Sequence, residues 1–68
     1  MRVREGDFAY DVEPMYDRTT LVRTGWWYGI FALRPEQKLA EGTADTREEA
    51  ERQAIRKLGQ IRERKQAA

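Results

Sequence analysis

The stretch WWYGIFAL, residues 26–33, decides the fold of this 68-residue chain. It is aromatic and β-branched, without the gaps of three or four residues that an amphipathic helix shows, which predicts a strand. Pro35 follows at a position that favours a type I turn over residues 34–37. We therefore expect the chain to reverse there and to form a hairpin with a next strand over residues 38–44.

Upstream, apolar and polar residues alternate over residues 7–13, which indicates a half-buried strand. Pro14 cannot donate a hydrogen bond to a sheet, so the strand either ends there or lies at an edge. Asp11 and Glu13 point to the same side of this strand, where we expect a solvated carboxylate pair. Residues 15–24 are expected to connect it to the next strand.

Downstream, the pattern becomes helical. Thr46 and Glu49 have the spacing of a capping box, which predicts a helix over residues 47–64. Its first turns are acidic and its last turns basic, as the helix dipole favours. Residues 62–68 are expected to form a frayed tail. The apolar residues form one stripe, made of Ala50, Ala54, Ile55, Leu58 and Ile61.

These elements predict a single α+β domain over residues 1–68. Its expected architecture is a three-stranded, mostly antiparallel sheet with one C-terminal helix packed on one face (β-β-β-α). A compact globule of this length has a radius of gyration of about 11 Å.

One helix covers only one face of such a sheet. We expect it to cover Trp27, Phe31 and Leu33, because Gly29 between the two aromatic residues permits a close approach. The open face is then expected to hold a patch that anchors a protein interface or stacks bases. Alternatively, the connection between the first two strands folds over this patch. The patch consists of Trp26, Tyr28 and Tyr10.

The net charge of +1 is unevenly distributed. Residues 1–51 hold seven basic and eleven acidic residues, a net charge of −4, whereas residues 52–68 hold six basic and one acidic residue, a net charge of +5. A basic stripe on the outer helix face is either a site for phosphates or for an acidic protein surface, or a solvated face. It consists of Arg52, Arg56, Lys57 and Arg64.

The composition argues against catalysis. The chain has no histidine, cysteine or serine, so nucleophilic triads and the usual zinc ligand sets are excluded. The glycines match no nucleotide-binding fingerprint. We therefore expect no enzyme activity, no cofactor and no metal. The absence of cysteine and of a long apolar segment predicts a soluble cytoplasmic protein without membrane contact.

The segment GTADTREEAERQAIRKLGQI resembles parts of two families through Gly42, Thr46, residues 48–50 and Ala54. It is similar to the HicB-like antitoxin module, a βββα unit that usually carries a further strand and a separate DNA-binding segment. It also resembles the last helix of double-stranded-RNA-binding domains, although acidic residues stand where those domains have lysines, so RNA binding does not carry over. The arm-binding domains of phage integrases, which contact DNA through the sheet, have a similar architecture.

We expect a small protein-binding module that regulates or inhibits a partner protein, of the kind found among phage and mobile-element accessory proteins. The alternative is a nucleic-acid-binding module that uses the open sheet face or the basic helix face. The chain is expected to be a monomer or a homodimer.

Overall fold

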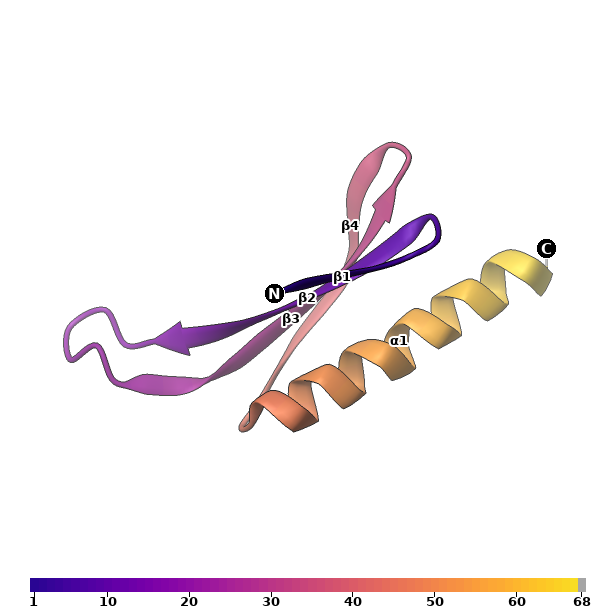
Figure 1. Ribbon diagram of the computed structural model, residues 1–68. Coiled ribbons are helices and arrows are strands. Elements are labelled where there is room, and N and C mark those ends of the chain that lie inside the picture. The colour runs from indigo at the N-terminus through magenta and orange to yellow at the C-terminus, as the bar shows by residue number, and fades with distance from the viewer. Residues whose placement is uncertain (68) are drawn as a thin grey trace.

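The computed structural model describes residues 1–67, with side chains for residues 1–64. It contains an antiparallel sheet of strand order β1-β2-β3-β4 and one C-terminal helix. The helix packs on one face of β2, β3 and β4, so the fold has two layers (Figure 1). The elements are β1 (Arg2–Glu5), β2 (Phe8–Tyr16), β3 (Arg23–Leu33), β4 (Glu36–Ala44) and α1 (Arg47–Ala67).

The expected α+β class, with an antiparallel sheet and a C-terminal helix, is confirmed. The expectation of three strands was wrong, because β1 forms a first hairpin with β2. The two-residue loop of that hairpin is Gly6–Asp7, and Gly6 has a φ of 64°. Glycine at the first position of a two-residue loop favours the turn types that match strand twist.

Strand β2 runs through Pro14 instead of ending there. The backbone N–H and C=O of Val12 both bond to Met1, so Val12 directs its backbone toward the outer edge. Residues two apart in a strand direct their backbone N–H and C=O groups to the same edge, so Pro14 also faces the outer edge. At that position β1 has already ended. The missing N–H therefore costs no bond to β3, and the proline protects the edge from other strands.

The β3–β4 hairpin is tighter than expected. Its loop is Arg34–Pro35 alone, with a cis peptide bond, in place of the type I turn over residues 34–37. The register shifts after Ile30, which pairs with Ala40, whereas Phe31 pairs with Lys38. The extra residue is Leu39, a bulge that disrupts the exposed edge of the sheet.

Helix α1 begins as predicted. The Glu49 amide donates to the Thr46 hydroxyl at 3.1 Å, so Thr46 is the N-cap. The Glu49 carboxylate accepts bonds from Arg52 and Gln53 rather than reaching back to Thr46. The helix extends to Ala67, three residues beyond the expected end.

The core lies between α1 and the face of β2 and β3 centred on Ile30. Ala50 and Ala54 are fully buried against it, and Leu58 is 4% exposed. Ile55 is 52% exposed, so its place in the predicted apolar stripe was wrong; it lies too far round the helix to reach the sheet. The buried cluster comprises Phe8, Tyr10, Val12, Ile30, Ala50, Ala54 and Leu58.

The molecule is longer than a compact globule of its size. Its radius of gyration is 13.1 Å, and its extents are 46 × 22 × 15 Å. The β2–β3 hairpin projects beyond the start of α1 at one end, and the C-terminal part of α1 extends beyond the sheet at the other (Figure 1). We call residues 15–24, the projecting end of this hairpin, the arm.

We predict that Leu58→Ala lowers the free energy of unfolding by about 2–5 kcal/mol, because it leaves a cavity between α1 and the sheet. Ile55→Ala is the matched control on the exposed side of the same helix, and its effect should stay within about 0.5 kcal/mol. Chemical denaturation of both variants measures the difference. Equal losses would contradict the helix orientation described here.

Candidate functional site

The expected aromatic patch of Trp26, Tyr28 and Tyr10 lies on the helix side of the sheet, so its assignment to the open face was wrong. Tyr10 is only 5% exposed, and Trp26 and Tyr28 pack against the core cluster. Burial, followed by the negative charges of Glu51 and Glu5, raises the pKa of Tyr10. These three aromatics therefore support the fold.

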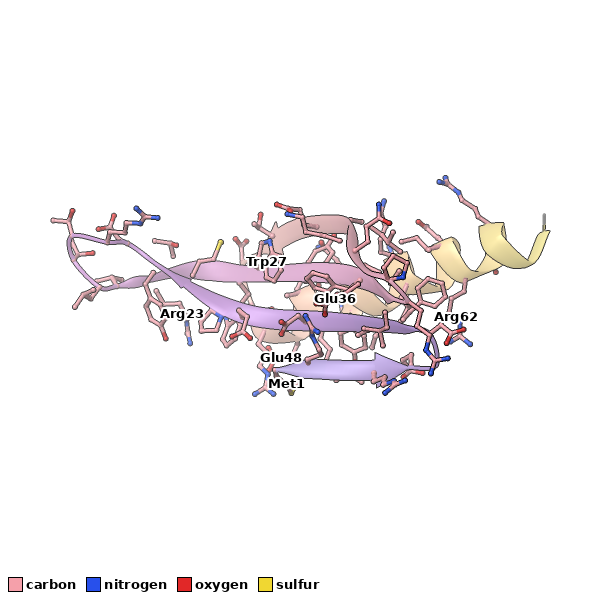
Figure 2. The ribbon with its side chains drawn as sticks, turned by 90° about the horizontal axis from the view of Figure 1, so that it is seen from above. Met1, Arg23, Trp27, Glu36, Glu48 and Arg62 are labelled. Atoms are coloured by element: carbon pink, nitrogen blue, oxygen red, sulfur yellow. The ribbon has the colours of Figure 1, made fainter. Side chains whose placement is uncertain are left out.

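The open face instead holds Trp27 and Phe31, which were expected to lie under the helix. Their ring centroids are 6.5 Å apart with an interplanar angle of 60°. They meet above Gly29, where an added Cβ would lie 2.5 Å from Trp27 Cη2 and 3.1 Å from Phe31 Cε2. Gly29 thus provides space for the two rings, and not for the helix as expected. We call Trp27, which is labelled in Figure 2, and Phe31 the aromatic pair.

Arg2, on the edge strand β1, covers the Phe31 end of the aromatic pair. The Arg2 guanidinium lies 4.8 Å from the centroid of Phe31, within cation–π range. Its Nη1 also lies 2.7 Å from Oε1 of Glu36 on β4. Arg2 therefore reaches from β1 across the open face, and Trp27 is left at the uncovered end.

Carboxylates surround the Trp27 end. Glu13 of β2 pairs with Trp27 of β3. Asp11 lies two residues before Glu13, on the same face of the sheet, as the strand pattern predicts. The Met1 ammonium lies 2.8 Å from Glu13 and 3.3 Å from Asp11, and its hydrogen bond to Glu13 is the largest of the effects that raise its pKa. On β4, hydrogen bonding and charge from Lys38 lower the pKa of Glu41, and a hydrogen bond with Trp27 adds a smaller effect.

The predicted basic stripe lies on the exposed side of α1, away from the sheet. Arg52 is paired with Glu49 at 3.0 Å. Within residues 1–64, Arg56, Lys57 and Arg64 make no ion pair. The stripe and the aromatic pair are thus on opposite sides of the molecule, and the structure does not combine them into one site.

The arm is a second exposed feature, and it does not fold back over the aromatics. Three apolar side chains are exposed near its tip, namely Tyr16 (57%), Leu21 (75%) and Val22 (62%). Leu21 has a φ of 60°, a conformation that costs a non-glycine residue free energy and occurs often at functional sites. The apolar residues at 15, 16, 21 and 22 were the sequence signal for this feature.

The tip is nevertheless well ordered by hydrogen bonds. The Asp17 carboxylate accepts from the amides of Thr19 and Thr20 at 2.8 and 2.9 Å. The Asp17 amide donates to Val22, and the Leu21 amide donates to Asp17. Hydrogen bonds therefore fix the backbone turn that carries the exposed apolar side chains.

Two hollows flank the start of α1, where the arm leaves the body. The larger, of about 610 Å³, is lined by Met15 and Ala44 together with the carboxylates of Asp45 and Glu49. The smaller, of about 420 Å³, also includes Asp45 but contains Arg23 and Arg47. The Arg23 guanidinium lies 5.4 Å from the Trp26 ring.

Comparisons with family models, with curated proteins and with solved structures find no match to this chain. Across the described residues, no helix is both long enough and apolar enough to cross a membrane. The same part of the chain contains no group of three or more acidic side chains arranged to hold a metal ion.

We predict that Gly29→Ala separates the aromatic pair, because the new methyl group occupies the space where the rings meet. The variant should lose stability and change its near-ultraviolet circular dichroism. Gly59→Ala is the control, since a Cβ at that helix position meets nothing within 4 Å. It should stabilise the protein by up to about 1 kcal/mol. Unchanged aromatic circular dichroism in Gly29→Ala would contradict the contact.

We predict that the arm tip loses order in acid. Hydrogen bonds from the Thr20 and Thr19 amides lower the pKa of Asp17. The stabilisation that these hydrogen bonds give the folded tip is fully present above the ordinary aspartate pKa of about 3.9. It is lost as the pH falls through the lowered pKa of Asp17. The amide chemical shifts of Thr19 and Thr20 should therefore titrate together below about pH 4, and this transition should disappear in Asp17→Ala. Amide shifts that do not follow Asp17 would refute the role of the carboxylate.

Proposed function

We propose that this chain is a small, non-enzymatic protein-binding module that regulates or inhibits a partner through the open face of its sheet. The observation that carries this proposal is the aromatic pair, which lies on the face that α1 leaves uncovered. Aromatic side chains at the centre of a protein interface commonly contribute 2 kcal/mol or more to binding. Trp27 is the expected anchor, because Arg2 covers only the Phe31 end.

The charges around Trp27 favour a protein partner with a basic group over a nucleic acid. Asp11, Glu13 and Glu41 lie beside it, and the Met1 ammonium and Lys38 pair with them. Three carboxylates against two cations leave a net negative charge next to the indole, which disfavours phosphates. A lysine or arginine of a partner would interact both with these carboxylates and with the indole face. The expected contact is therefore an aromatic anchor with an acidic surround.

Nucleic-acid binding remains the second candidate, and one observation favours it. Arg56, Lys57 and Arg64 are exposed on α1 and unpaired within the described side chains. Such a row of cations suits phosphates. This function would use the helix and not the aromatic pair.

We predict that Trp27→Ala and Phe31→Ala reduce the capture of a specific partner from lysates of the source organism. Loss of an anchor of about 2 kcal/mol corresponds to roughly a 30-fold loss of affinity. The matched control is the double variant Arg56→Glu and Lys57→Glu, which should capture the partner as the parent does. Circular dichroism of each variant shows whether the fold is retained.

Titration with single- and double-stranded oligonucleotides at low and moderate salt separates the two candidates. The protein-binding function predicts weak binding or none. Tight binding that falls steeply with salt, and that is lost in the Arg56 and Lys57 double variant, would instead establish the second candidate. Equal capture by the Trp27→Ala variant and the parent would refute the role of the open face.

A further inference from the structure

The arm has an exposed apolar tip that carries Arg18. Arg23, nearer the base of the arm, also makes no ion pair within the described side chains and lies over the Trp26 ring. Arg18 makes no ion pair within the described side chains, while the Asp17 carboxylate is occupied by the Thr19 and Thr20 amides. The tip thus presents Leu21 and Val22 beside a free positive charge. A complementary surface would be apolar with a negative rim.

The larger hollow at the base of the arm offers part of this chemistry. The Met15 and Ala44 side chains supply apolar surface, and Asp45 supplies a carboxylate that makes no ion pair within the described side chains. The Glu49 carboxylate is already bound by Arg52 and Gln53, and the remaining lining is polar. The smaller hollow is unsuitable, because Arg23 and Arg47 would repel Arg18. The arm projects away from its own base, so its tip does not reach this hollow within one chain (Figure 1).

The edge of the arm next to this hollow has no neighbouring strand. The last residue pair between β3 and β4 is Trp26 with Ala44, so β3 is unpaired on that side at Thr24. Another strand therefore has access to the edge of the arm directly beside the hollow.

From these features we infer that two copies of the chain form a homodimer through their arms. The arms lie side by side and antiparallel along their β3 edges, related by a two-fold axis. Because both arms have the same length, about 15 Å for five residues, each tip reaches the base of the other arm. The dimer therefore contains two identical contacts between a tip and a base, related by the two-fold axis.

In each contact, Arg18 of one copy meets Asp45 of the other, because Arg52 already occupies the Glu49 carboxylate. Leu21 of the first copy packs on Met15 and Ala44 of the second. The strained φ of Leu21 is consistent with this role, because it aims an apolar side chain outward at a position where asparagine or glycine costs less. The aromatic pair is not part of this interface, so a dimer would present two open faces.

Sedimentation equilibrium of the purified chain tests this inference over concentrations from about 1 μM to about 1 mM, the range that detects a weak to moderate dimer. The parent should be a dimer in the upper part of this range. Arg18→Glu should raise the dimer dissociation constant at least about tenfold. Combining Arg18→Glu with Asp45→Arg should recover most of that loss, which a non-specific effect of charge would not do.

Leu21→Asn tests the apolar contact without threatening the fold, because asparagine tolerates this φ better than leucine does. It should weaken the dimer by a similar factor. Leu39→Asn, at an exposed leucine on β4 outside the arm, is the matched control and should leave dimerisation unchanged. In a mixture of labelled and unlabelled chains, isotope-filtered nuclear Overhauser effects should connect Leu21 of one copy with Met15 of the other.

A monomer at every concentration would overturn the inference, as would a dimer insensitive to both Arg18→Glu and Leu21→Asn. These measurements use the purified chain alone and do not involve Trp27 or Phe31. A failure of the dimer is therefore distinct from a failure of partner binding at the open face.

Discussion

The packing of Ala50 and Ala54 of α1 on Ile30 of β3 is the interaction on which the rest of the structure depends. All three side chains are fully buried. Alanines let the helix axis approach the sheet closely, and Leu58 fills the space further along the helix. Because side chains alternate along a strand, burial of Ile30 under the helix places Trp27 and Phe31 on the opposite face. The half-buried aromatic pair on the open face is thus a direct consequence of the core.

This core is small, and a single helix covers only part of the sheet. A domain of about 60 residues buries only about 60% of the surface that its unfolded chain exposes. Apart from single exposed residues such as Leu39 and Ile55, apolar groups outside the core gather in two places, the aromatic pair and the arm tip. Both are held in defined positions, one above Gly29 and the other by hydrogen bonds to Asp17. These two surfaces are the ones on which the proposed partner contact and the proposed dimer depend.

Several elements were predictable because their signals are local. The Thr46 cap, the helical period after it and the strand over residues 26–33 depend on neighbouring residues, and all three occur in the structure. Strand β1 was missed because four residues with one apolar side chain do not show a strand pattern. The Gly6–Asp7 loop before an alternating segment was the available signal. The β3–β4 hairpin was expected, but its tighter loop and the Leu39 bulge were not.

The sequence by itself therefore determined the α+β class, the order of the longer elements and the position of the helix cap. Alternation along residues 26–33 also determined which side chains share a face. Only the tertiary structure decided which of those faces the helix covers, because both faces are aromatic and apolar and the choice depends on packing between distant segments. Ile30 fits under the alanines of α1, whereas the rings of Trp27 and Phe31 fill the space above Gly29 themselves. The projection of the arm was decided in the same way, since the length of the hairpin exceeds the part that β4 and α1 contact.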